Sequence, residues 1–278
     1  MFKKKKDQTY QSYWSISWNI FKKNKVAMVC LFIVILLCLI ALFAPLIAPY
    51  DPNKQVLTDR LMKPCGQHWF GTDDLGRDIF SRIIYGCRVS LSVGIISQII
   101  ATVIGYTMGV CAGYYGGKVD SVISFLIQVF SSFPFLLFAM AIMFVLGPGL
   151  INLYLALGLL GWASTARLIR GDVMRLKKME YIDACKVSGG NSFRIIMKHL
   201  LPNCLSTLIV TVTLGIPNAI MSEASLSFLG LGVKAPMASW GSMISFSQPY
   251  IRSATYYSVI PGLAIIITVL AFNMLGDG

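Results

Sequence analysis

Four charged residues that could take part in catalysis or metal binding lie within six consecutive positions of the sequence. They are Asp73, Asp74, Arg77 and Asp78, in the run GTDDLGRDIFSR. Paired carboxylates can transfer protons or bind a hard cation such as Ca²⁺. The sequence places no nucleophile and no complete set of metal ligands beside them, and Arg82 follows Asp78 at the spacing of an ordinary helical surface pair. We therefore predict an ordered, charge-rich segment without a catalytic or metal-binding role.

The motifs of several other chemistries are missing from the sequence. No G-x-x-x-x-G-K-[ST] phosphate-binding loop occurs, and GGKV at 116–119 lacks the leading glycine and the hydroxyl. The 7 cysteines form no C-x-x-C pair, and the 2 histidines, His68 and His199, are far apart. We predict that the chain is not an enzyme and holds no metal, cofactor or ATP of its own.

The elements that carry these residues are strongly apolar. Hydrophobic residues make up 56% of the sequence and charged residues 13%, and the mean hydropathy is +0.69. A soluble domain carries about 25% charged residues. The net charge of +12 could indicate a nucleic-acid partner, but the basic residues cluster beside apolar runs, as membrane orientation requires. A polytopic membrane protein with no nucleic-acid partner is therefore predicted.

Six apolar runs are long enough to cross a bilayer as helices, so the predicted fold is all-α. The expected spans are 26–48, 89–114, 121–146, 150–168, 204–229 and 257–275. The first is longer than the apolar region of a signal peptide, and we expect it to be retained. The predicted organisation is a basic amphipathic segment (1–25), a first transmembrane helix (26–49), an external segment (50–88) and a core of five transmembrane helices (89–278).

Smaller signals predict how these helices turn and pack. Gly-Pro-Gly at 147–149 indicates a tight turn, and Pro134 and Pro217 are expected to bend their helices. Gly105 and Gly109 stand four residues apart, a spacing that favours close packing between helices.

Basic residues predict which side of the membrane each loop faces. Sixteen of the 24 Lys and Arg residues lie before residue 26, at Lys118 or between Arg167 and Lys198, and the other eight fall on the opposite side. The richer side is cytoplasmic by the positive-inside rule. Because the number of spans is even, both termini are predicted to be cytoplasmic.

Glu223 is the one clear carboxylate within a predicted span, between Met221 and Leu226. A carboxylate there is costly unless it faces a cavity or a partner. We predict that Glu223 lines a path through the protein or contacts another subunit. The alternative is that it lies near the outer end of its helix and reaches interfacial water.

The polar, basic run EYIDACKVSGGNSFRIIMKHLLPN at 180–203 predicts two short helices joined at glycines. Gly189 and Gly190 can end the first helix, and Asn191 or Ser192 can cap the second. The first helix has a small-residue face formed by Tyr181, Ala184, Cys185 and Ser188, and the second an apolar stripe formed by Phe193, Ile196, Met197 and Leu200. Such an elbow fits a groove on a cytoplasmic partner, although a plain connector lying on anionic lipid has the same local pattern.

This run resembles the cytoplasmic EAA loop of binding-protein-dependent ABC importer permeases. That loop reads E-A-A, three residues, Gly, about nine residues and a hydrophobic–x–L–P ending. Asp183-Ala184-Cys185 stand at E-A-A, Gly189 at the glycine and Leu201-Pro202 at the ending. Asp and Cys depart from the motif but keep its charge or small size. The resemblance implies that the loop, at about 170–202, docks into an ATP-binding subunit and carries its closure into the membrane.

Four further runs resemble the C-type subunit of the dipeptide/oligopeptide/nickel permeases: HWFGTDDLGRDIFSRIIYGCRVSLSVG, SEASLSFLGLGV, ASWGSMI and FNMLGDG. The resemblance implies a type I importer permease in a bacterial cytoplasmic membrane. Its expected partners are a homologous B-type permease, two ATP-binding subunits that hold ATP and Mg²⁺, and an external substrate-binding protein that contacts the 50–88 segment. The implied substrate is a di- or oligopeptide, with nickel or a metal chelate as the alternative. An ATP-independent channel or proton-coupled carrier that uses Glu223 is the alternative from another class.

Overall fold

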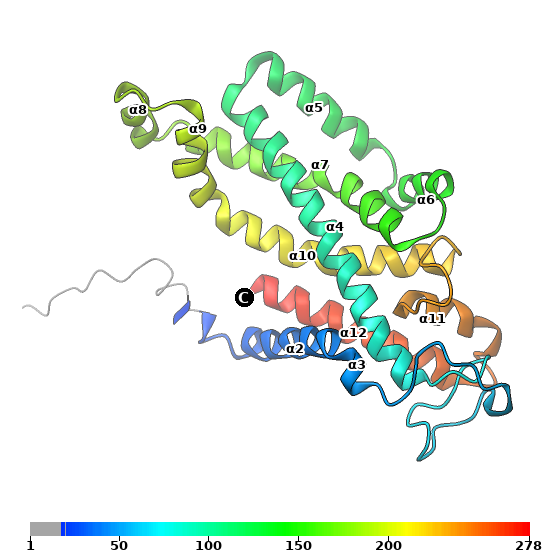
Figure 1. Cartoon of the computed structure of the whole chain (residues 1–278). Helices are drawn as coiled ribbons and strands as arrows, with labels where there is room; N and C mark the ends of the chain where they lie inside the picture. Colours follow the sequence, from blue (N-terminus) through cyan, green and yellow to red (C-terminus); the bar gives the residue numbers. More distant parts are fainter. Residues whose placement is uncertain (1–17, 20) are drawn as a thin grey trace, which may run out of the picture.

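The computed structural model describes residues 18–19 and 21–278, so most of the predicted amphipathic segment at 1–25 lies outside the described residues. Within them the chain is helical and forms no strand, which confirms the all-α prediction (Figure 1). The helices are α2 (Lys25–Leu42), α3 (Ala44–Ile47), α4 (Ile79–Tyr115), α5 (Gly117–Ser132), α6 (Phe135–Leu146), α7 (Leu150–Leu176), α8 (Glu180–Val187), α9 (Ser192–Ile195), α10 (Leu201–Phe228), α11 (Trp240–Ser247) and α12 (Thr255–Asp277).

About six of these elements correspond to the predicted spans. In the described part of the chain, α2, α4, α12 and the continuous run Ser192–Phe228 are long and apolar enough to cross a membrane. The pair α5 and α6 qualifies as a fifth span if it is counted as one broken helix. α7 falls outside this set, yet it packs along α4 and occupies the sixth place in the bundle.

Three expected spans differ most from the structure, and a local feature accounts for two of these differences. α4 begins at Ile79, ten residues before the expected span and inside the predicted external segment, because Asp78 caps it by accepting a 2.7 Å hydrogen bond from the Ser81 N–H. The expected span 121–146 is broken by an 89° bend, since Pro134 forces Phe133 into an extended conformation. α7 runs on to Leu176, past the expected end at 168.

Glycines bring α4 and α7 into direct backbone contact. A Cβ atom on Gly105 would lie 2.8 Å from the Trp162 carbonyl oxygen, and one on Gly109 would lie 2.7 Å from that of Ala166. One helical turn further on, the same atom on Gly113 would lie 2.9 Å from a carbonyl oxygen of α7. Only glycine permits this approach. The packing predicted from the glycine spacing is therefore confirmed, and we call this contact the glycine seam.

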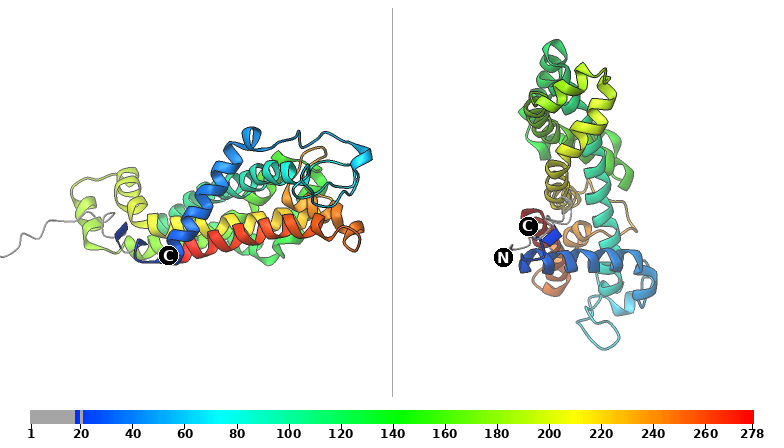
Figure 2. Two further views of the ribbon diagram at one scale, coloured as in Figure 1. Left: turned by 90° about the horizontal axis from the view of Figure 1, so that it is seen from below. Right: turned by 90° about the vertical axis from the view of Figure 1, so that its left-hand side faces the viewer.

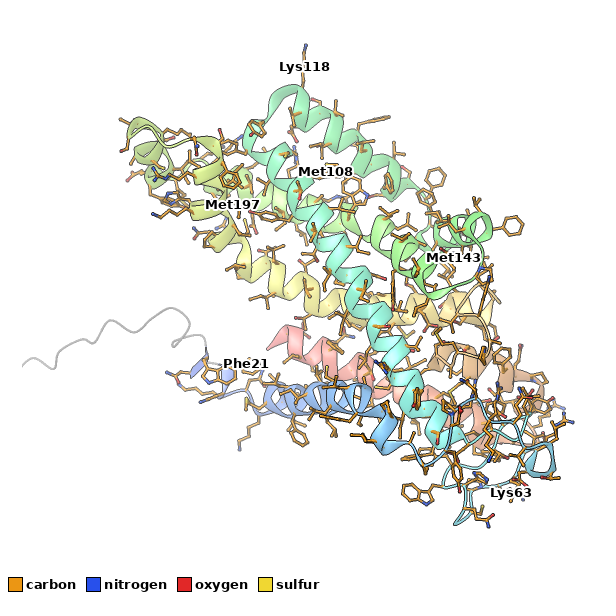
Figure 3. All side chains as sticks on the ribbon, in the orientation of Figure 1. Phe21, Lys63, Met108, Lys118, Met143 and Met197 are labelled. Atoms are coloured by element: carbon orange, nitrogen blue, oxygen red, sulfur yellow. The ribbon has the colours of Figure 1, made fainter. Side chains whose placement is uncertain are left out.

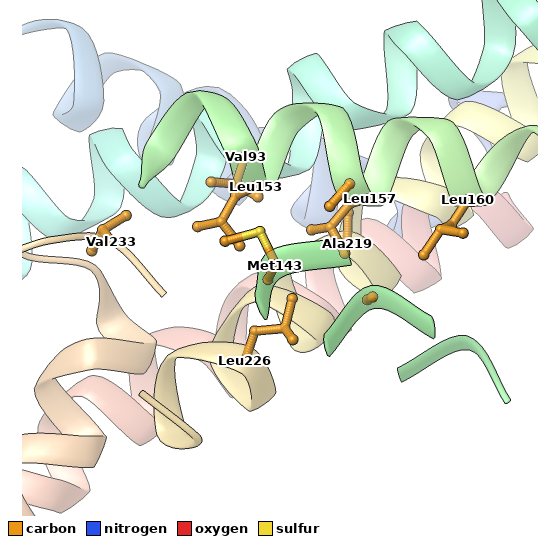
Figure 4. Packing of buried hydrophobic residues seen from close by; sticks show 10 residues of the cluster. Val93, Met143, Leu153, Leu157, Leu160, Ala219, Leu226 and Val233 are labelled. Carbon is orange, nitrogen blue, oxygen red and sulfur yellow. The ribbon is translucent and has the colours of Figure 1, made fainter. Parts of the chain in front are cut away.

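A buried apolar cluster joins α6, α7 and α10 at one side of the seam. Met143 of α6 lies between Leu153 of α7 and Leu226 of α10, and all three side chains have no exposed surface (Figure 4). Val93 adds α4 to the same cluster. Close packing within this cluster holds the bent half-helix α6 against the bundle.

The loops and ends of the chain divide between two ends of the bundle. α8, α9 and both described ends of the chain lie toward one end, and residues 50–78 lie at the other (Figures 1 and 2). The side chains of Met197 and Lys63 mark these two ends (Figure 3). This placement agrees with an even number of crossings.

We expect Gly109→Val to destabilise the protein, because the new side chain would collide with the Ala166 carbonyl and with Ile169. Overpacking of this kind costs about 1–3 kcal/mol. The melting temperature of the purified protein in detergent should fall by several degrees. Gly171→Val is the matched control, since a Cβ at Gly171 of α7 meets nothing within 4 Å. Equal melting of the two variants would contradict the glycine seam.

Candidate functional site

α8 is attached to the bundle by one buried side chain. Ile182 has no exposed surface and belongs to a cluster with Val173 and Leu176 of α7 and with Ile195 and Leu200. The remainder of α8 is open to its surroundings, because each of its other residues is exposed apart from half-buried Cys185. The helix is therefore fixed on one side and available for contact on the other.

The predicted glycine junction after α8 is confirmed. Gly189 has φ +79°, and the Gly190 N–H donates to the Cys185 carbonyl at 2.9 Å, which closes the carboxyl end of the helix. Asn191 then caps α9 by accepting a 2.8 Å hydrogen bond from the Arg194 N–H. Each turn of the elbow thus has a local chemical cause.

The predicted small-residue face of α8 is largely exposed. Tyr181 is 41% exposed, and Asp183 and Ala184 are exposed, whereas Cys185 is half-buried. Asp183 accepts a 2.8 Å hydrogen bond from Lys186, and this bond raises the pKa of the lysine. The outer face of α8 thus carries the Tyr181 ring, the small residue Ala184 and a salt bridge between Lys186 and Asp183.

The predicted apolar stripe of the second helix is wrong in part. Phe193 and Met197 are 71% and 46% exposed, and the buried residues are Ile195 and Leu200. A π-helical turn at Ile196–Leu200 changes the helical period between α9 and α10, so the faces expected from a regular α-helix do not hold. Of the EAA-like ending, Leu201 is half-buried against the cluster around Ile182, and Pro202 is exposed in the first turn of α10.

Val187 is a candidate that the sequence analysis missed. It is 90% exposed at the end of α8, the highest value among the exposed large apolar side chains of the described residues. Its only sequence signal was an apolar residue at the end of a short helix whose other large aliphatic residue, Ile182, is buried. With so little cover at the end of α8, the Val187 side chain is available for a contact with a partner protein.

Glu223 lies inside the subunit, which corrects the prediction that it lines a path. It has no exposed surface. Its carboxylate accepts hydrogen bonds from Ser227 at 2.6 Å and Ser239 at 2.7 Å, with Ser90 further away at 3.5 Å. The carboxylate also does not reach interfacial water, so the alternative is wrong as well. Neither prediction could foresee this, because Ser90 and Ser239 come from distant parts of the sequence.

The same serines connect three helices. Ser239 caps α11 in a reciprocal pair with Ser242. Ser90 of α4 accepts a 3.2 Å hydrogen bond from the Trp240 N–H, and the Trp240 indole donates to the Ile83 carbonyl at 3.1 Å. Glu223 is therefore the acceptor at the centre of a network that fixes the start of α11 against α4 and α10.

The acidic cluster at 73–78 is a buried network, and the predicted surface pair is wrong. Asp73 pairs with Arg77 at 2.6 Å and with Arg82 at 3.4 Å, while Asp78 pairs with His68 at 2.9 Å. All five side chains are buried. Asp78 is engaged as the cap of α4 and does not pair with Arg82. In the described residues no three His, Cys, Asp or Glu side chains are grouped to hold a metal ion.

A hollow of about 610 Å³ opens between α4, α6, α7 and α10 near the middle of the bundle. Glu223 is not part of its wall. No charged residue lines the hollow, and its polar wall residues are Ser97, Gln98, Ser164, Thr165, Thr211, Asn218, Ser222 and Ser225. The chain therefore presents neutral hydrogen-bonding groups at mid-bundle.

We expect Glu223→Leu to destabilise the protein, because it leaves the buried hydroxyls of Ser227 and Ser239 without an acceptor. Each such group costs about 1–3 kcal/mol. Glu223→Gln keeps one carbonyl oxygen and should cost less. Thr213→Val is the control, since that exposed hydroxyl donates to its own helix. The melting temperatures of the three variants in detergent rank their stabilities. A Glu223→Leu variant as stable as Thr213→Val would refute the central role of Glu223.

Two family profiles match the chain. The profile described as "Binding-protein-dependent transport system inner membrane component" covers residues 102–278, and "N-terminal TM domain of oligopeptide transport permease C" covers residues 12–64. Among solved structures, the MetNI methionine ABC transporter in an inward-facing conformation matches with a TM-score of 0.58 at 19% identity. The match covers 72% of this chain and 94% of that chain, and it shows a shared fold.

Curated relatives align over nearly the whole chain. The dipeptide transport system permease protein DppC of Bacillus subtilis is 44% identical, with 96% of this chain and 84% of the relative covered. The oligopeptide transport system permease protein OppC of the same organism is 40% identical, with coverage of 96% and 88%. The glutathione transport system permease protein GsiD of Pectobacterium atrosepticum is 39% identical, with coverage of 98% and 91%. The resemblance seen in the motifs is confirmed: the chain belongs to the family of binding-protein-dependent transport system inner membrane components, with the amino-terminal domain of its C-type permeases.

Proposed function

We propose that this chain is one of two membrane subunits of an ATP-driven importer of di- or oligopeptides. The family and the names of the relatives support the peptide substrate. The observation that carries the proposal is α8, a short helix held by buried Ile182 and exposed elsewhere at one end of the bundle. Such a helix fits insertion into a groove of a partner.

The partners in this proposal are a B-type permease, two cytoplasmic ATP-binding subunits and an external substrate-binding protein. The sequence has no phosphate-binding loop, so ATP and Mg²⁺ would be held by the ATP-binding subunits. The excess of basic residues around the elbow supports a cytoplasmic position for α8 and for both termini. Residues 50–78 would then face the binding protein.

Mechanical continuity supports α8 as the coupling element. The chain from Ser192 to Phe228 is one helical run, so a displacement of α8 acts on α10 through the short junction at Gly189 and Gly190. α10 supplies much of the wall of the mid-bundle hollow. Closure of the ATP-binding subunits would thus bias the bundle between inward- and outward-facing states.

A reconstituted system tests the proposal. The tagged chain is purified in mild detergent with its partners, identified by mass spectrometry and placed in liposomes with its binding protein. ATP-dependent uptake of tritium-labelled trialanine is the expected result. Uptake of radioactive nickel without trialanine would favour the metal alternative of the family, and transport by this chain alone without ATP would overturn the importer.

We expect Gly189→Val to abolish uptake while membrane insertion stays intact. The φ of +79° costs a residue with a Cβ about 1–2 kcal/mol, and a β-branched side chain adds strain, so α8 would be misplaced. No atom crowds this position, so the backbone alone causes the effect. Gly189→Asn is the matched control, because asparagine tolerates the left-handed region. Normal uptake by the Val variant would contradict the coupling role.

We expect Val187→Glu to weaken binding of the ATP-binding subunits, because a charge would replace an apolar contact. Co-purification of these subunits with the tagged chain should drop at least several-fold. Leu57→Glu introduces the same acidic residue in place of an exposed apolar side chain at the other end of the bundle and should retain them. Equal recovery with both variants would remove Val187 from the contact.

A further inference from the structure

A second hollow, of about 1090 Å³, opens between α2, α10 and the end of α12, and we call it the α2–α10 groove (Figure 1). Its volume is at the upper end of the range for cavities that hold small molecules. Its wall includes the aliphatic side chains of Leu31, Leu205, Ile209, Val210 and Leu275. Ile209 and Val210 are 50% and 43% exposed, so the described residues leave apolar surface open in this groove.

The polar side chains of the groove offer little to a polar ligand. Asn203 donates to the His199 carbonyl at 2.6 Å, and the Thr213 hydroxyl donates to the Ile209 carbonyl at 2.8 Å. Both side chains therefore bond to the backbone of their own helical run. Among the described residues, no charged side chain lines the groove. An occupant of the groove must be largely apolar.

The groove is about as long as one leaflet of a bilayer is thick. It follows α10 from Pro202 to Thr213, a separation of 11 residues, or roughly 17 Å at 1.5 Å per residue. The hydrocarbon core of a bilayer is about 30 Å thick, so one leaflet accounts for roughly 15 Å. The acyl chains of a lipid that lies parallel to α10 would fit this length.

Aromatic and basic residues gather at the Pro202 end of the groove. Trp18 and Phe21 form part of the wall there, with their rings stacked at a centroid distance of 5.6 Å (Figure 3 labels Phe21). Lys22, Lys23 and Lys25 follow in the sequence and are exposed, and the Lys22 ammonium lies 5.3 Å from the centre of the Trp18 ring. Aromatic rings of membrane proteins are enriched at the level of the lipid headgroups.

The charge beside this end of the groove is positive in the described part of the chain. Lys198 is exposed four residues before Pro202, which adds a fourth ammonium group to the three lysines before α2. The acidic side chain beside the wall is that of Asp277, which is exposed near the end of α12. Four ammonium groups and one carboxylate together favour an anionic headgroup over a neutral one.

We propose that the α2–α10 groove binds an anionic phospholipid, with acyl chains along α10 and the phosphate group against Lys22, Lys23 and Lys25. Each lysine beside an anionic lipid headgroup strengthens binding roughly fivefold. The site requires only that the chain lies in a membrane and does not depend on which substrate is transported. Its place in the cytoplasmic leaflet rests on the orientation in the proposed function.

Native mass spectrometry of the assembled transporter, with its partner subunits, tests the headgroup contact. Dioleoylphosphatidylglycerol is titrated as the anionic probe, and dioleoylphosphatidylcholine as the neutral one. The variant with Lys22→Gln, Lys23→Gln and Lys25→Gln should raise the Kd of one bound phosphatidylglycerol by roughly tenfold or more. The matched control is Lys54→Gln, Lys63→Gln and Lys234→Gln, which removes three exposed lysines outside the groove and should leave that Kd unchanged.

A second variant tests the acyl-chain contact while all lysines stay in place. Ile209→Trp puts a larger side chain into the groove and should displace the lipid. Ile266→Trp is its control, because Ile266 is 53% exposed on α12 and lies outside the groove wall. All variants are compared at equal amounts of recovered complex.

Each outcome decides for or against the lipid site. Tighter binding of phosphatidylglycerol than of phosphatidylcholine, lost in the groove variants and kept in both controls, would support it. Equal binding of the two lipids, or equal loss with the control lysines, would overturn the specific headgroup contact. Absence of a retained lipid in the unmodified transporter would also overturn the proposal and leave the groove to be covered by a partner subunit.

Discussion

The direct backbone contact between α4 and α7 is the constraint on which the rest of the structure depends. Lipid tails are as apolar as leucine, so helices in a membrane gain little from apolar burial and associate through close packing. Gly105, Gly109 and Gly113 permit that packing over three successive turns. The seam sets the direction of α7, which carries the chain to α8.

A second constraint acts on α10 from both of its ends. At one end the chain passes through a π-helical turn into α9 and the glycine junction of α8. Near the other end, Glu223 accepts hydrogen bonds from serines that also hold α11 and α4. A buried carboxylate is tolerated only when its partners are in place, so this anchor is specific. α10 is thus held at one end and linked to an exposed helix at the other, which is the arrangement that the proposed coupling uses.

Local sequence accounts for most of the fold and for part of the candidate site. Apolar runs predicted the spans, because bilayer thickness and helical rise fix the length of such a run. Gly189 predicted the end of α8, because glycine alone takes φ +79° without a Cβ penalty. Boundaries were less well predicted where a cap or a proline acted, as at Asp78 and Pro134, because these residues begin or break a helix without altering the hydropathy of the run.

The sequence by itself determined that the chain is a helical membrane permease with a short glycine-jointed elbow. Only the tertiary structure decided that Glu223 is an internal anchor, that Asp78 and Arg82 do not pair, and that Ser97 and Thr165 share one hollow. Periodicity reports neighbours within about four residues on a helix. Glu223 and Ser90 are 133 residues apart in the sequence, so their contact follows from how the helices pack and from no pattern within either helix.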